Sequence, residues 1–430
     1  MLKVFSILLT GIVTSFYFFP FKFSFLPMAN TKMILAALGL LTLMVNLSKG
    51  RTSTMDKNFF ILSLWGVIVS LIGFVSTVVN DTFDYVYATY IVSMWVWLGG
   101  AYAVTRMIKF VHGQVSIRLV CHYLIGVCVA QCIIAFLMGQ YPVIGQFVDS
   151  FLGSEGYMGK VEGRLYGIGA ALDVAGMRFA AVLIMIVWLC FNTQNILSTK
   201  VITSYIIAFL VICVIGNMIG RTTTIGMLAA LGYWLWTISI SSQKREQNVR
   251  LFSTYLCALL LCFLPIIIYL YHTDDMVHQN IQFGFEGFFS LFETGKWETT
   301  STGILKNMYV FPDNLETWII GDGYFDNPRF TDPYYIGHNW IGFYQDTDVG
   351  YLRFIYYFGI IGLLLFMFFM YKSASICMYR IPSHRFLFGA ILILNYIVWI
   401  KVASDLFLVL ALFLCVSAEE ENAYNESCGD

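Results

Sequence analysis

The stretch that decides the fold is residues 321–362, GDGYFDNPRFTDPYYIGHNWIGFYQDTDVGYLRFIYYFGIIG. Its first part is rich in aromatic, acidic and glycine residues, and from Val349 it becomes an apolar run that continues to about Met370. Apolar runs of this length are typical of helices that cross a membrane. We therefore expect the polar residues before Val349 to lie at the mouth of a membrane helix.

The chain as a whole has the composition of a polytopic membrane protein. Of its 430 residues, 59% are hydrophobic and 12% are charged, which is far from the usage of soluble domains. Apolar runs of about 20 residues predict about 12 transmembrane helices, at 4–20, 33–48, 59–79, 85–105, 118–139, 173–191, 201–217, 222–241, 251–271, 349–371, 386–400 and 402–418. The expected fold is an all-α polytopic membrane protein with one transmembrane domain over residues 1–430.

The distribution of charge predicts which loops face the cytoplasm. Lysine and arginine residues occupy alternate short loops, at 49, 51 and 57, at 106, 109 and 118, at 244, 245 and 250, and at 372, 380 and 385. The positive-inside rule places these loops, with both termini, in the cytoplasm. Two long loops, 140–172 and 272–348, are then extracytoplasmic, and the second is expected to fold as short helices on the membrane domain. The formal net charge of −1 gives no indication of nucleic acid binding.

Four arginines lie near the start of expected helices on the outer side: Arg164, Arg178, Arg221 and Arg353. Both the helix dipole and the positive-inside rule disfavour a cation there, so these positions indicate an anion. Helix N-termini and guanidinium groups both bind phosphate oxygens, and converging helix starts would form a pyrophosphate site. In the alternative interpretation, each arginine reaches into lipid headgroups or pairs with a carboxylate such as Asp173 or Asp348.

The residues just before the helix at 349–371 are those expected where a sugar meets a charged leaving group. Trp340, Tyr344 and Tyr351 could stack on sugar faces, although membrane interfaces also use these residue types. Asp346 and Asp348 have the DxD spacing that can bind a divalent cation, but an aspartate before a helix is also a common N-cap. The pairs Asp81 with Asp84 and Asp274 with Asp275 are expected to be solvated loop residues.

Three segments resemble the O-antigen polymerase (Wzy-type) family and the related O-antigen ligases. They are GRLYGIGAALDVAGMRFA at 163–180, IGRTTTIGMLAALG at 219–232, and TDVGYLRFIYYFGIIG at 347–362, preceded by GDGYF at 321–325. The resemblance implies a GT-C-like glycosyltransferase that needs neither a metal nor another cofactor. It also implies a donor and an acceptor linked to undecaprenyl pyrophosphate, a bacterial inner membrane with the active site on the periplasmic side, and a chain-length regulator as a candidate partner.

The resemblance assigns roles to the residues singled out above. Arg164, Arg178 and Arg221 match positions where the family keeps cationic loop residues. His338 and Asn339 are similar to the HN pair of the ligase relatives, which is more often followed by Glu-Gly than by the Asp-Val-Gly found here.

Glycosyl transfer from a polyprenyl pyrophosphate mainly requires stabilisation of the leaving charge, for which the four arginines, including Arg353, are the candidates. Asp348, His338 and Asp346 are the candidates for the base that deprotonates the acceptor hydroxyl. The choice between His338 and Asp348 stays open.

Two other functions compete with the polymerase. A ligase would transfer a finished glycan to lipid A-core through the same chemistry. A flippase or transporter for lipid-linked oligosaccharides belongs to a different class, in which binding sites lie near the bilayer midplane, often between broken helices. The ionisable residues of this chain cluster on the outer side instead, which favours the enzyme.

Overall fold

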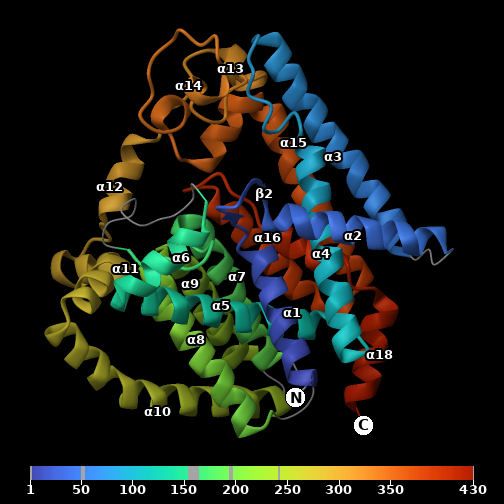
Figure 1. Ribbon diagram of the computed structural model, residues 1–430. Helices are drawn as coiled ribbons and strands as arrows, with labels where there is room; N and C mark the ends of the chain where they lie inside the picture. Colours follow the sequence, from blue (N-terminus) through green and yellow to red (C-terminus); the bar gives the residue numbers. More distant parts are fainter. Residues whose placement is uncertain (1, 50–53, 154–163, 193–196, 241–242, 430) are drawn as a thin grey trace. The chain divides into compact units, whose positions relative to one another are not determined.

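The computed structural model describes residues 2–49, 54–153, 164–192, 197–240 and 243–429 (Figure 1). Residues 154–163 of the expected loop 140–172 lie outside this part, as does Arg51 of the expected cytoplasmic loops. The described chain is helical, as the composition predicts, apart from one hairpin of β1 (Lys22–Phe23) and β2 (Leu26–Asn30). This confirms the all-α expectation.

The chain divides into two compact units, which are described separately. The first unit comprises Met1–Ile34 and Met107–Trp297, and the second comprises Leu35–Arg106 and Glu298–Asp430. The expected loop 272–348 is therefore divided between the units after Trp297.

The helices of the first unit are α1 (Leu2–Phe18), α5 (Ile117–Gln140), α6 (Pro142–Phe151), α7 (Leu172–Phe191), α8 (Thr199–Ile219), α9 (Thr223–Ile240), α10 (Gln243–Thr273) and α11 (Asp275–Thr294). The second unit contains α3 (Thr54–Val79), most of α2 (Thr31–Ser48) and α4 (Tyr90–His112), and then α12 (Thr300–Asn307), α13 (Leu315–Ile319), α14 (Pro328–Thr331), η1 (Tyr344–Asp346), α15 (Gly350–Arg380), η2 (Pro382–His384), α16 (Arg385–Val398), α17 (Phe407–Leu414) and α18 (Ala418–Gly429).

Eight helices of the described chain are long and apolar enough to cross a membrane. They span Thr31–Ser48, Lys57–Val79, Tyr90–His112, Ile117–Gln140, Leu172–Phe191, Thr199–Ile219, Gln247–Thr273 and Gly350–Arg380. The expected spans at 4–20 and 386–400 correspond to shorter apolar helices, and the span at 402–418 to the 8-residue α17. These helices support a polytopic membrane protein. The number 12 and the orientation of the loops stay predictions.

The fourth expected span starts later than predicted. Residues 85–89, which we expected to begin it, are not helical: residues 86–89 form turns, and α4 starts at Tyr90. The reason is that the preceding segment is anchored by its polar groups, as described below for Asp84.

Helix α7 forms the centre of the first unit. In the most apolar 18 residues of this helix, 94% of the residues are buried, and α5, α8, α9 and α10 pack around them. Glycines allow α9 and the end of α8 to approach it closely. A Cβ atom at Gly226 on α9 would lie 2.1 Å from the Cα of Ala180, and one at Gly176 on α7 would lie 2.8 Å from the carbonyl oxygen of Gly220, the C-cap residue of α8. Helix α7 and the glycine-rich segment at 219–232 are thus packed against one another.

Helix α15 is the central helix of the second unit, and it is broken. Phe358 (φ −136°, ψ 20°) and Gly359 (φ 67°, ψ −175°) depart from helical geometry inside the 31-residue helix. Such a break in an apolar helix releases backbone groups that need other partners, because an unpaired polar group costs several kcal/mol in a lipid environment.

Residues 321–323 supply those partners. The carbonyl oxygen of Tyr356 accepts from the Asp322 N–H at 2.6 Å, and that of Tyr357 accepts from the Gly323 N–H at 3.2 Å and from the Ser76 hydroxyl at 2.6 Å. This close approach requires glycine at position 321, since a Cβ atom there would lie 2.6 Å from the backbone of α15. The stretch 321–362 therefore folds back so that its first residues fill the break in its own helix, near α13 and the end of α3 (Figure 1).

Replacing Gly359 by alanine is expected to destabilise this unit strongly. An L-residue disfavours the backbone conformation of Gly359, and its Cβ atom would lie 2.1 Å from the carbonyl oxygen of Ile319. We expect a loss of at least about 3 kcal/mol, measured as a lower Tm of the purified protein in detergent. Gly303→Ala is the matched control, because a Cβ atom there meets nothing within 4 Å. Equal Tm values for the two variants would contradict the role of the break.

Candidate functional site

Arg353, in the first turn of α15, is held by the protein itself. Its Nη2 donates to Oδ1 of Asp326 at 2.8 Å and to the carbonyl oxygen of Phe325 at 3.0 Å, and its Nη1 lies 3.8 Å from Oδ1 of Asp348. The guanidinium group lies between the rings of Phe325 (3.8 Å) and Phe343 (3.5 Å), and the residue is 4% exposed. Of the two interpretations of this arginine, the contacts favour pairing with carboxylates.

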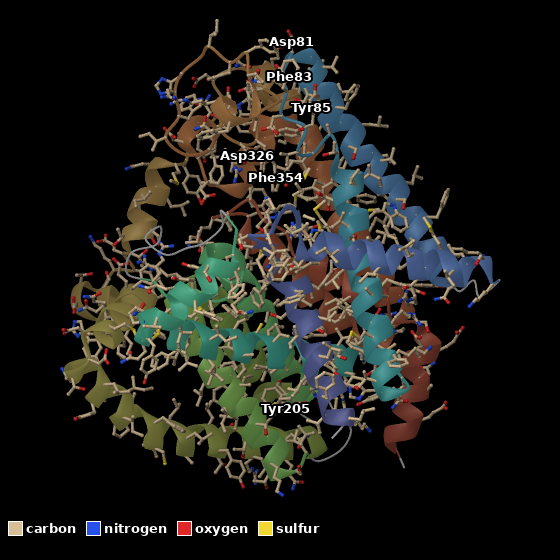
Figure 2. The ribbon with its side chains drawn as sticks, in the orientation of Figure 1. Asp81, Phe83, Tyr85, Tyr205, Asp326 and Phe354 are labelled. Atoms are coloured by element: carbon tan, nitrogen blue, oxygen red, sulfur yellow. The ribbon has the colours of Figure 1, made fainter. Side chains whose placement is uncertain are left out.

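Asp84 was expected to be a solvated loop residue, and this was wrong. It is 1% exposed, and its Oδ2 accepts from the N–H groups of Phe325 (2.9 Å) and Asp326 (3.0 Å). Its carbonyl oxygen accepts from the hydroxyl of Tyr357 on α15. The carboxylate is buried because the folded-back residues 321–326 bring donors that no local pattern reveals. Asp81, at positive φ, is exposed as expected (Figure 2).

Asp326 lies at the edge of this network. Its side chain is 41% exposed, and Figure 2 labels its position. Burial raises the pKa of its carboxyl group, while the charge of Arg353 lowers it. In this network the carboxylate of Asp326 is therefore accessible at the surface, whereas the guanidinium group of Arg353 is buried.

A second cluster forms around Asp322, which sequence reasoning missed. Its Oδ1 accepts from the Thr317 hydroxyl at 2.5 Å, and its Oδ2 accepts from the Tyr344 hydroxyl at 3.0 Å. Burial raises the pKa of this carboxyl group, although both hydrogen bonds act in the opposite direction. The ring centroid of Tyr344 lies 5.3 Å from that of Tyr324 and 5.6 Å from that of Trp340. The result is a half-buried carboxyl group among aromatic rings.

The expected residues His338 and Asp346 have different surroundings. His338 is exposed, and its ring lies 4.4 Å from that of Trp340. Oδ1 of Asp346 accepts from the N–H groups of Ile341 and Gly342, both at 2.8 Å, so this carboxylate stabilises the turn that leads into α15. Among the expected rim residues, the structure thus joins His338, Trp340 and Tyr344 in one chain of ring contacts.

Asp348 and Tyr351 lie at the start of α15. The side chain of Asp348 is 30% exposed and faces Arg353. The hydroxyl of Tyr351 donates to the carbonyl oxygen of Tyr396 on α16 at 2.9 Å, and its ring contacts Trp399. Tyr351, expected to bind sugar, therefore connects two helices.

In the first unit, Arg164 and Arg221 converge on one aromatic ring. Their guanidinium carbons lie 4.6 Å and 4.0 Å from the ring centroid of Phe283 on α11. Arg221 also donates through Nε to the carbonyl oxygen of Phe283 at 2.9 Å and pairs through Nη1 with Glu286 at 2.7 Å. Burial lowers the pKa of Arg221, the Glu286 carboxylate raises it, and the charge of Arg164 lowers it. A guanidinium group nonetheless stays charged at physiological pH.

The segments that carry these two arginines are fixed by short backbone and hydroxyl contacts. The Leu165 N–H donates to the carbonyl oxygen of Met218 at 3.2 Å, and the Thr222 hydroxyl donates to Oδ1 of Asp173 at 2.5 Å. Together with the close packing of α7 on α9, these contacts hold the loop before α7 against the turn between α8 and α9. The convergence of Arg164 and Arg221 is thus a property of the unit's core.

Arg178 belongs to a different environment. It is 7% exposed, its Nη1 donates to the carbonyl oxygen of Phe18 at 2.5 Å, and its guanidinium group lies over the rings of Phe18 and Phe19. Phe18 is the last residue of α1, where a cation stabilises the free carbonyl end of the helix. The structure therefore places two of the three expected arginines of this unit together, and the third at a helix end.

No group of three or more His, Cys, Asp or Glu side chains suited to a metal ion occurs in the part of the chain that the structure describes. Of the expected DxD pair, Asp346 binds backbone N–H groups and Asp348 faces an arginine.

Comparisons with protein-family models, with characterised proteins and with solved structures find no match to this chain. The function is therefore argued from the two sites themselves.

Replacing Asp322 by asparagine is expected to leave the protein at least as stable at pH 7. A raised pKa in the folded state means that this group favours folding below its unfolded pKa of about 3.9, and that this contribution is lost as the pH rises through the folded value. At neutral pH the ionised carboxylate is therefore the less favourable form. The amide keeps the bond from Thr317, and the Tyr344 hydroxyl can accept instead of donate.

The measurement is the Tm of both proteins from pH 4 to pH 8 in detergent. The difference should favour the variant most at neutral pH and shrink toward pH 4. The opposite result would be a Tm of the variant that falls below that of the native protein at pH 7 but not at pH 4. It would show that the charged carboxylate of Asp322 stabilises the fold.

Proposed function

We propose that this protein is a membrane glycosyltransferase that polymerises oligosaccharide repeat units carried on undecaprenyl pyrophosphate into O-antigen or a related surface polysaccharide. It would act in the bacterial inner membrane, with its sites on the periplasmic side. The observation that carries the proposal is the convergence of Arg164 and Arg221 on Phe283. The resemblance of the segments that contain these two arginines to the polymerase family supports it.

The two arginines suit a pyrophosphate leaving group. Departure of the sugar leaves negative charge on the pyrophosphate, and prearranged guanidinium groups stabilise that charge in forked hydrogen bonds. The Glu286 carboxylate, whose side chain is 30% exposed, pairs with Arg221. In the proposed mechanism a phosphate group takes the place of this carboxylate on Arg221 and also binds Arg164.

The second unit would bind the acceptor sugar. Trp340, Tyr344 and Tyr324 offer aromatic faces, and Asp322 offers a carboxylate in contact with one of them. Rings for stacking with a few polar groups for orientation are the usual composition of a carbohydrate site. The base that accepts the proton of the acceptor hydroxyl would be Asp348 or His338.

The competing functions differ in what they require. A ligase uses the same donor chemistry with lipid A-core as the acceptor, so both sites described above would serve it equally. A transporter would use the break in α15 as a binding site at the bilayer midplane. In this chain residues 321–323 occupy the break, which favours an enzyme.

Replacing Arg164 or Arg221 by glutamine is expected to abolish long polymer. Loss of one donor to a developing oxyanion typically lowers the rate about 100-fold or more. The purified protein would be incubated with a synthetic undecaprenyl-pyrophosphate repeat unit, with and without a chelator, and the products separated by length. Lys296→Gln, an exposed cation in the same unit, is the matched control. Polymer of normal length from both arginine variants, at equal protein level, would refute the proposed pyrophosphate site.

The same assay separates the two candidate bases. If Asp348 accepts the proton, Asp348→Asn should lose turnover by at least about 100-fold, whereas His338→Ala should change it by less than about tenfold. The reverse result would assign the role to His338. Because Asp348 also faces Arg353, the Tm of each variant must be compared with that of the native protein.

A further inference from the structure

An open cavity lies within the first unit, away from the arginine site. Its volume is about 560 Å³, and residues 7–16 of α1 and 119–134 of α5 form most of its wall. His112, Phe21 and Ile168 complete the lining. Both long walls belong to apolar helices, and Leu8 and Ile12 on α1 are more than half exposed. The cavity therefore opens on a surface suited to lipid.

One end of the cavity is polar and basic. Nε2 of His112 lies 2.8 Å from the hydroxyl of Tyr123, and Nε2 of His122 lies 2.5 Å from the hydroxyl of Tyr205 on α8, which Figure 2 labels. Lys3 is close enough for its charge to act on His112. Arg118, one turn before His122 on α5, acts on that imidazole in the same way. Two imidazole rings thus line this end, and one positive charge lies near each of them.

The remainder of the cavity is apolar. Gln131 is the main polar side chain there, and its amide is used within the protein, because Nε2 donates to the Ser15 hydroxyl at 3.0 Å and Oε1 accepts from the Ile168 N–H at 2.9 Å. From Gly126 to Ile134 the wall extends about 12 Å along α5 at 1.5 Å per residue. One leaflet contributes about 15 Å of hydrocarbon, so this length suits a chain from a single leaflet.

We propose that this cavity binds one acyl chain of an anionic glycerophospholipid, with the headgroup phosphate at the end lined by His112 and His122 and near Lys3 and Arg118. The apolar length accommodates the chain, and the basic end complements the phosphate. The cluster of lysine and arginine residues at this end marks the leaflet side rich in anionic lipids. The site is independent of glycosyl transfer and would serve to hold α1 against α5.

The floor of the cavity provides a selective variant. Gly11 and Gly126 both line the cavity, and a Cβ atom at either position would meet no heavy atom within 4 Å. Gly126→Phe should therefore fill the space without displacing the backbone. Gly232→Phe is the matched control, since a Cβ atom at Gly232 on α9 also meets nothing within 4 Å and lies outside the cavity lining.

The experiment measures the Tm of the full chain in detergent with added phosphatidylglycerol, phosphatidylcholine of the same acyl chains, or undecaprenyl phosphate. Phosphatidylglycerol should raise the Tm of the native protein and of Gly232→Phe by roughly 3–5 °C, and phosphatidylcholine should not. Gly126→Phe should lose this shift. Arg118→Gln should lower the apparent affinity for phosphatidylglycerol about fivefold.

Three results would overturn the proposal. They are equal shifts with phosphatidylglycerol and phosphatidylcholine, an unchanged phosphatidylglycerol shift in Gly126→Phe, and a shift with undecaprenyl phosphate but none with phosphatidylglycerol. If Gly126→Phe does not fold, an unchanged affinity in Arg118→Gln overturns it instead. Because no glycan donor is present, the result does not depend on the proposed enzyme activity.

Discussion

The second unit depends on the pairing of two carbonyl groups in the middle of an apolar helix. A break in α15 frees the carbonyl oxygens of Tyr356 and Tyr357, and in an apolar environment each must find a donor. The N–H groups of Asp322 and Gly323 and the hydroxyl of Ser76 supply them. This one requirement brings residues 321–323 onto α15, which in turn buries Asp84 and places Asp322 beside Tyr344. The candidate acceptor site is thus a consequence of how a broken helix is repaired.

The same requirement explains why arginines that look alike in the sequence have different roles. Arg178 donates a hydrogen bond to a carbonyl oxygen at the end of α1. Arg353 donates to the carbonyl oxygen of Phe325 and pairs with two carboxylates. Both are nearly buried, at 7% and 4% exposure. A position at the outer end of a helix shows that a cation needs a partner. It does not show whether that partner is a ligand or the protein.

The sequence predicts most of what depends on local hydrophobicity and little of what depends on long-range backbone pairing. In the part of the chain that the structure describes, the apolar runs identify every helix long and apolar enough to span a membrane, because burial in lipid requires continuous apolar residues. The break in α15 escapes prediction, since Phe358 and Gly359 lie in an unremarkable apolar run and the partners of the freed carbonyls lie more than 30 residues away. Asp84 was missed for the same reason, because its donors, the N–H groups of Phe325 and Asp326, lie about 240 residues away in the sequence. Asp322 was missed because no local pattern shows that its carboxylate accepts from both Thr317 and Tyr344. Asp346 and Tyr351 were recognised as residues of the rim, but their hydrogen bonds to Ile341, Gly342 and Tyr396 could not be.

Partial exposure is what separates Arg164 and Arg221 from the buried arginines. A guanidinium group can bind a ligand only if an anion can reach it without unfolding its surroundings, and these two are half-buried and partly open. Their placement on one ring brings like charges together, which is unfavourable unless an anion is shared. Glu286 provides one negative charge from α11 and pairs with Arg221. A diphosphate has enough oxygen atoms to bind two guanidinium groups at once, and this is the physical reason for which we propose the donor site at this pair.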